Sequence, residues 1–205
     1  MKAAVLNAPQ TPLSIEELTL DKPGPTEAVI RVIAAGVCHS DLHFIEGTYP
    51  TRHPAVLGHE VAGIVSEIGS AVTNVSAGDR VIIGFVQPCG HCADCDSGRP
   101  NLCSQGAPRR ESPGLMRDGE AVTQMANVGG FAEYVITYAS GLVKVADDIP
   151  LEIAALVGCS VMTGYGAVVN TAGVTPGSTV AVIGAGGVGL NIIQAAALAG
   201  AEKVI

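Results

Sequence analysis

Four of the six cysteines fall within one short segment, PCGHCADCDSGRPNLC, which runs from Pro88 to Cys103. Their spacing is C-x2-C-x2-C-x7-C. Thiolates held this close repel one another unless a cation lies between them, and a tetrahedral zinc ion with four sulfur ligands suits such a loop. A site filled by four sulfurs leaves no position for a substrate, so its role is structural. We therefore expect a structural zinc lobe at residues 88–104, held by Cys89, Cys92, Cys95 and Cys103.

Two other uses of these thiols deserve comparison. An iron–sulfur cluster is the chief alternative, but the C-x3-C-P ending of the ferredoxin pattern is missing. The N-terminal MKAAVLNAP lacks the long apolar region of a signal peptide, so we expect a cytoplasmic protein. Thiols stay reduced in that compartment, which disfavours disulfides. His91 lies inside the loop, and we expect it to be a solvated side chain, since four thiolates already complete a tetrahedron.

The charge balance narrows the classes of partner. Eleven basic and nineteen acidic residues give a net charge of -8. Nucleic acids and anionic membranes both favour clustered Lys and Arg, so we expect neither as a partner. Glycines interrupt the apolar runs, and we expect no membrane span.

The hydrophobic pattern divides the chain near Pro150. Before it, short runs rich in Val, Ile and Ala alternate with Gly, Pro, Asn and Asp, which is typical of a β-sandwich or barrel. These runs cover residues 1–6, 28–37, 61–69, 79–86 and 131–138. After Pro150, residues 151–172 show helical spacing. Residues 178–184 then read as a buried strand, as in parallel sheets, followed by a glycine turn and an Ala-rich helix that ends at Gly200.

The glycine turn has the pattern G-x-G-x-x-G at Gly184, Gly186 and Gly189. A lone match is weak, but this one follows a predicted strand and opens a predicted helix. In that setting the first glycine permits a tight turn, the second lets a pyrophosphate approach, and the third lets the helix pack on the strand. The helix N-terminus then offers free N–H groups to the phosphates. We expect a dinucleotide site here rather than a turn without a ligand.

The predicted α/β unit holds one strand, one helix and part of a second strand. An open parallel sheet needs more strands than these, so we expect the sequence to be the first part of a longer protein. The acidic residue that binds the cofactor ribose would lie about 20 residues further on, at or past position 205. The sequence therefore does not predict the choice between NAD and NADP.

Cys38 and Cys159, with His59 between them, could supply the three protein ligands of a catalytic zinc. Spacing alone does not establish this, because the three are far apart and a buried cysteine is usually a small hydrophobe. However, six segments occur together and in order: GVCHSDLH, GHEVAGIVSEIG, GDRVI, PCGHCADCDSGRPNLC, GCSVMTGYGA and GAGGVG. Over nearly its whole length the chain thus resembles a zinc-dependent alcohol dehydrogenase of the medium-chain dehydrogenase/reductase superfamily.

The resemblance implies a fold and a set of roles. The fold would be a β-rich GroES-like catalytic domain over residues 1–150, followed by the start of an α/β Rossmann domain over residues 151–205. A catalytic zinc, the second of two zinc ions, would be held by Cys38, His59 and Cys159, with Glu60 as an alternative ligand. Asp41 would orient a ligand imidazole, Ser40 would accept the alcohol proton, and His43 would pass it toward solvent. The implied cofactor-binding residues are His39, Thr163, Gly184, Gly186, Gly187 and Gly189, and Tyr49 and Phe85 would line the substrate pocket or simply pack.

The implied activity is hydride transfer between an alcohol or aldehyde and NAD, with NADP not excluded. The whole protein would be a homodimer or homotetramer. A polyol or a thiol–aldehyde adduct is the alternative substrate within the superfamily, and Arg109, Arg110 and Arg117 could serve an anionic adduct or form a solvated loop face. A non-catalytic zinc-binding fragment is the alternative from another class. Nicotinamide binding separates that fragment from an enzyme.

Overall fold

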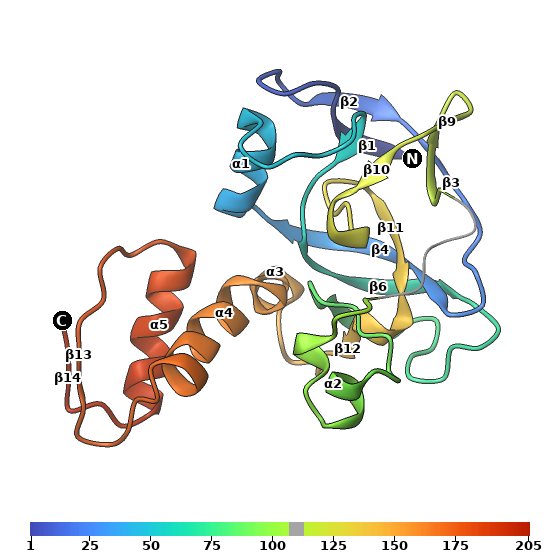
Figure 1. Ribbon diagram of the computed structural model, residues 1–205. Helices are drawn as coiled ribbons and strands as arrows, with labels where there is room; N and C mark the ends of the chain where they lie inside the picture. Colours follow the sequence, from blue (N-terminus) through green and yellow to red (C-terminus); the bar gives the residue numbers. More distant parts are fainter. Residues whose placement is uncertain (107–112) are drawn as a thin grey trace.

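The structure is a computed structural model that describes residues 1–106 and 113–205. A β-rich body is formed by the first part of the chain, and a helical part with the C-terminus lies to one side of it (Figure 1). This change of structure falls between β12, Leu142–Lys144, and α3, Leu151–Ala154. The position agrees with the change of hydrophobic pattern near Pro150.

The centre of the β-rich body is a five-stranded antiparallel sheet in the order β11-β4-β6-β7-β12. Successive side chains point to opposite faces of this sheet, and those on one face form the largest core cluster, whereas Ala62 and Ile82 on the other face pack against α3. Gly63 is required in β6, because a Cβ there would clash with the Arg31 carbonyl oxygen of β4. The strand bounds are β4 Glu27–Gly36, β6 Glu60–Ile68, β7 Arg80–Ile83 and β11 Tyr134–Tyr138.

Two smaller sheets complete the body. One has the order β10-β5-β1-β2 and the other is the antiparallel β3-β8-β9. Arg117 of β8 connects them, since its Nη1 lies 2.8 Å from Oε2 of Glu16 in β2. A strand is present in each of the five predicted runs, and β1 belongs to the run at residues 1–6, whereas the other strands of the two smaller sheets were not predicted. Their bounds are β1 Lys2–Leu6, β2 Ser14–Glu17, β3 Thr19–Leu20, β5 Ala55–Val56, β8 Leu115–Arg117, β9 Glu120–Ala121 and β10 Thr123–Gln124.

Short α-helices and 3₁₀ turns lie around the body. Helix α1, His39–Glu46, follows β4 and ends at Gly47, whose φ of 79° is a left-handed conformation that glycine adopts without strain. The cysteine segment forms its own lobe with α2, Ala93–Asp96, and the 3₁₀ turn η1, Pro100–Leu102. Two further 3₁₀ turns flank β11, namely η2, Met125–Asn127, and η3, Ala139–Gly141.

The helical part begins with α3 and continues through η4, Ala155–Gly158, α4, Ser160–Gly166, and the π-type turn η5, Ala167–Thr171. Strand β13, Thr179–Val180, then leads to α5, Gly187–Leu198, and β14, Lys203–Val204. Among the described residues no single helix is long and apolar enough to cross a membrane. The segments Leu151–Gly158 and Ser160–Thr171 meet those criteria only when joined across a 52° bend.

Strands β13 and β14 pair in parallel, so with α5 they form one β–α–β unit. Gly200, at φ 82°, follows α5 as predicted. The expectation of a buried strand over residues 178–184 is wrong in extent and burial: only Thr179–Val180 is a strand, and Ile183 is fully exposed. The physical reason is that, among the described residues, only β14 pairs with this strand and no layer covers its outer side chains.

Candidate functional site

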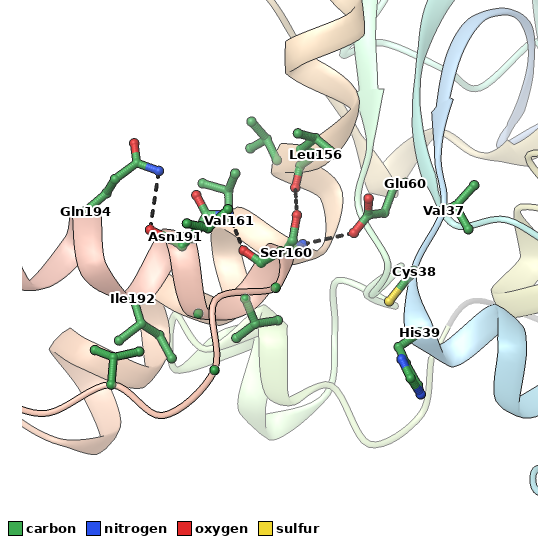
Figure 2. Close-up of a pocket in the computed structure, with 18 of the residues that line it drawn as sticks. Val37, Cys38, His39, Glu60, Leu156, Ser160, Val161, Asn191, Ile192 and Gln194 are labelled. Atoms are coloured by element: carbon green, nitrogen blue, oxygen red, sulfur yellow. Dashed lines mark hydrogen bonds between the residues drawn. The ribbon is translucent and has the colours of Figure 1, made fainter. Parts of the chain in front are cut away.

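A cleft of about 880 Å³ lies where the β-rich body meets the helical part. The body contributes Cys38 and His39 from the start of α1 and Glu60 from the start of β6. The helical part contributes the N-terminal ends of α4 and α5, including Ser160 (Figure 2). The glycine turn borders the same cleft with Gly184, Gly186, Gly187 and Gly189. Two motifs far apart in the sequence therefore face one space.

Asp41 holds together the part of the site that the β-rich body contributes. It is only 1% exposed, and its carboxylate accepts the backbone N–H of Cys38 and that of Gly58, each at 2.9 Å. The same Oδ1 that binds Gly58 lies 3.6 Å from Nδ1 of His59. One buried carboxylate thus fixes the turn before α1, the turn before His59, and the orientation of the imidazole.

Cys159 lies in the site because the backbone of the turn before α4 packs closely against the backbone of β7. Gly158 precedes it, and a Cβ at Gly158 would lie 2.6 Å from the Ile83 carbonyl oxygen of β7. Glu60, which is 3% exposed, supports the same turn, because its Oε1 accepts the Ser160 N–H at 3.3 Å. Gly36 leaves room for this carboxylate, since a Cβ there would clash with Glu60.

The ligand atoms of Cys38, His59, Glu60 and Cys159 all lie within 4.8 Å of one another. Burial opposes ionisation of Cys38, but hydrogen bonds from Ser40 and the charge of His59 outweigh it and lower the pKa of the thiol. Burial likewise opposes a charged imidazole, yet Asp41 and Cys159 raise the pKa of His59 to about 10. The surroundings therefore favour positive charge, and two thiolates, one imidazole and a carboxylate are a donor set that fits zinc.

The second group of donors is the cysteine lobe. The sulfurs of Cys92 and Cys95 lie 3.5 Å apart, those of Cys92 and Cys103 3.8 Å, and those of Cys89 and Cys95 4.0 Å. Tetrahedral zinc with Zn–S bonds of about 2.3 Å would hold its sulfurs about 3.8 Å apart. Hydrogen bonds from the Cys89 and Gly106 N–H groups help lower the pKa of Cys103 to about 6. The four thiols fit a closed sulfur site.

The glycine turn also fits the ligand that its pattern predicts. Gly184 has a φ of 98°, and a Cβ at Gly189 would clash with its carbonyl oxygen, so the turn requires glycine at both positions. Gly186 is the N-cap of α5, and a Cβ there would meet nothing within 4 Å. Gly186 is therefore not needed for packing, which leaves open space in front of the α5 N–H groups.

The remaining predicted residues lie around these groups. His43 is on α1, with its ring 4.8 Å from that of His39 and 5.0 Å from that of Tyr49. Phe85 packs against the His59 ring at 5.3 Å. Tyr49, Phe85 and Thr163 do not border the cleft itself, and Thr163 lies one turn into α4, with its N–H bonded to Cys159.

Two further observations bear on the sequence analysis. Ser160, which supports Glu60 and borders the cleft, was not predicted; its position directly after Cys159 at the start of a helix was the available signal. Arg117 is held by Glu16 and by Asn7, at 2.6 Å, on the β-rich body. Arg109 and Arg110 lie outside the described residues.

Comparison with known proteins gives the family. Residues 24–147 match the family described as Alcohol dehydrogenase GroES-like domain. A putative alcohol dehydrogenase D of Mycobacterium tuberculosis is 43% identical over 211 residues, covering 99% of this chain. An NDMA-dependent alcohol dehydrogenase of Amycolatopsis methanolica is 44% identical over 210 residues and covers the whole chain. In each case the chain spans 57% of the relative's length.

Solved structures agree with the sequence relatives. The alcohol dehydrogenase zinc-binding domain protein from Burkholderia ambifaria superposes with a TM-score of 0.91 at 37% identity, over 99% of this chain and 57% of that one. The chain therefore belongs to the alcohol dehydrogenase GroES-like family, within the zinc-dependent alcohol dehydrogenases of the medium-chain dehydrogenase/reductase superfamily. Its fold is a β-rich GroES-like domain followed by the start of an α/β Rossmann unit.

Proposed function

We propose that this chain forms the metal-holding part of a zinc-dependent oxidoreductase that moves a hydride between an alcohol or aldehyde and NAD or NADP. One observation carries the proposal: two cysteines, a histidine and a glutamate converge within 4.8 Å, and the cleft that Cys38 and Glu60 border is also lined by the glycine turn. In this proposal residues 1–150 form the catalytic domain and residues 151–205 the start of the nicotinamide-binding domain.

Cys38, His59 and Cys159 would hold the catalytic zinc, and Glu60 would be an alternative ligand on the cleft side. A zinc ion there supplies Lewis-acid polarisation of the substrate oxygen, and the nicotinamide carries the hydride. Asp41 would orient His59, because its Oδ1 lies 3.6 Å from His59 Nδ1 and accepts the N–H of the preceding Gly58. Cys89, Cys92, Cys95 and Cys103 would hold a second, structural zinc, giving two per chain.

Ser40 and His43 would move the alcohol proton outward. Ser40 hydrogen-bonds the Cys38 thiol, which places its hydroxyl beside the metal-ligand set. His43 is on the same helix and its side chain is one-third exposed, so it would connect the interior to solvent. His39, which lines the cleft, would face the cofactor phosphates, with Gly184, Gly186, Gly187 and Gly189 around them. Thr163 would contact the nicotinamide, and Tyr49 and Phe85 would shape the substrate side.

Zinc content and cofactor binding test this proposal. We expect two zinc ions per chain by native mass spectrometry, and one in Cys159→Ser, because only the ligand set at the cleft is broken. Gly186→Ala should keep the wild-type stability, since its Cβ meets nothing, yet bind NAD(P) more weakly. Equal NAD(P) affinity in Gly186→Ala and wild type would contradict the assigned cofactor position.

Alcohol oxidation should then be assayed in the full-length protein with NAD, NADP and NDMA as acceptors.

A non-catalytic zinc-binding role is the second candidate, and the four-cysteine lobe favours it, because a site filled by four sulfurs leaves no position for a substrate. Two bound zinc ions with no detectable NAD(P) binding would support this role. The thiol-adduct alternative has less support, because Arg117 is engaged by Glu16.

A further inference from the structure

We propose that His39 and His43 form a third cation site, a two-histidine site on α1 for a borderline divalent ion such as Ni²⁺ or Zn²⁺. The two residues are four apart in one helix, so their side chains lie on the same face. Their ring centroids are 4.8 Å apart, with the planes at 65°. Two imidazoles at this spacing can share one ion, as the paired histidines of helical zinc motifs do.

The contacts of His43 leave one ring nitrogen for the ion. Its Nδ1 is buried, makes no hydrogen bond in the described structure, and lies 3.8 Å from Oε2 of Glu46. A histidine that ligates a metal commonly turns its other nitrogen toward a carboxylate, which fixes the ring. Tyr49 also packs against the His43 ring at 5.0 Å. Glu46 and Tyr49 therefore restrain the imidazole, and in this proposal its Nε2 binds the cation shared with His39.

This site differs in chemistry from the two cysteine-containing sites. It has no sulfur ligand, His39 is exposed and His43 is one-third exposed, so water would complete the coordination shell. We expect binding that is weaker than at the thiolate sites and reversible. The consequence for catalysis depends on the proposed function: an ion shared by His39 and His43 would occupy both the phosphate-facing side chain and the outer proton carrier, and would therefore inhibit.

Calorimetric titration with Ni²⁺ tests the site. The protein is first loaded with zinc, desalted and shown by mass spectrometry to hold two zinc ions, and its zinc is measured again after the titration. We expect one further equivalent of Ni²⁺ without zinc release. His39→Gln and His43→Gln should each weaken this step by about tenfold or more, because one of two nitrogen ligands is lost. His91→Gln is the matched control, since His91 is exposed and its Nδ1 contacts the Cys89 carbonyl oxygen rather than a second imidazole, and it should bind Ni²⁺ as the wild type does.

The proposal is overturned if the wild type takes up no further Ni²⁺, or if His39→Gln and His43→Gln bind it as tightly as His91→Gln. The latter result would mean that the two rings pack together without sharing an ion. If His39→Gln fails to retain two zinc ions, because it adjoins Cys38, the comparison of His43→Gln with His91→Gln decides alone. The titration uses no nicotinamide and no activity, so its failure and a failure of the proposed function are distinguishable.

Discussion

Replacing Asp41 by Asn should destabilise the zinc-loaded protein by about 2–4 kcal/mol. The wild-type carboxylate is 1% exposed and accepts two backbone N–H bonds at 2.9 Å, one on each oxygen. An amide keeps one acceptor oxygen but presents an NH₂ group to the other N–H, so one bond is lost and a buried donor is left unpaired. A hydrogen bond to a charged group is worth about 1.5–3 kcal/mol, and an unpaired buried donor costs about 1–3 kcal/mol. These two energies partly describe the same loss, so the total is smaller than their sum.

Urea unfolding followed by circular dichroism measures this loss. Asp147→Asn is the matched control, because Asp147 is fully exposed and lies 3.9 Å from Arg80 Nε, so that solvent screens the pair. Chelator competition should also show about 10–100-fold weaker zinc binding at the His59 site, with the four-cysteine site unchanged. If Asp41→Asn unfolds within about 0.5 kcal/mol of the control, the carboxylate does not organise the two turns as argued.

Three other perturbations have definite expected outcomes. Hydrogen bonds from Ser14, Arg117 and Asn7 lower the pKa of Glu16 to about 2, so its contribution is present above the ordinary value of 4.5 and is lost as pH falls toward 2. As the pH falls through that range, the thermal unfolding midpoint of Glu16→Gln should decrease less than that of the wild type. An equal decrease in the two proteins would contradict this. Leu57→Ala, at a fully buried position, should cost about 3–5 kcal/mol in urea unfolding, against at most about 0.5 for Ile15→Ala, which is 71% exposed. Cys103→Ser should leave one zinc per chain by mass spectrometry, held at the cleft; retention of two would show that the lobe does not need its fourth thiolate.

The features that neighbouring residues form, namely the long strands, the cysteine lobe and the glycine turn, could be predicted from the sequence. The long strands lie in runs rich in Val, Ile and Ala that Gly, Pro, Asn and Asp bound, and the lobe cysteines lie close in sequence, so both could be predicted from local sequence. The glycine pattern likewise predicted positions where no side chain fits, such as Gly189 against Gly184. The resemblance of ordered motifs, rather than spacing, supplied the set Cys38, His59 and Cys159, because no period links residues so far apart.

What the sequence did not predict depends on partners brought together by the fold. Strands of two residues, such as β5, Ala55–Val56, carry too few side chains to show a period. The Glu16–Arg117 pair joins residues on different sheets, and nothing in either local segment identifies the other. Ser160 acts through its backbone N–H, a group that every residue except proline carries, so its side chain gave no signal.

The close approach at Gly158 has a consequence for assembly of the metal sites. The lobe thiols belong to one short segment, so they can come together before the rest of the tertiary structure has formed. The proposed cleft ligands come from the turn before α1, the start of β6 and the turn before α4, and Cys159 can join them only after β7 is in place beside Gly158. We therefore expect the two sites to fill in sequence during refolding with zinc, the lobe first, and the cleft site to report completion of the tertiary structure.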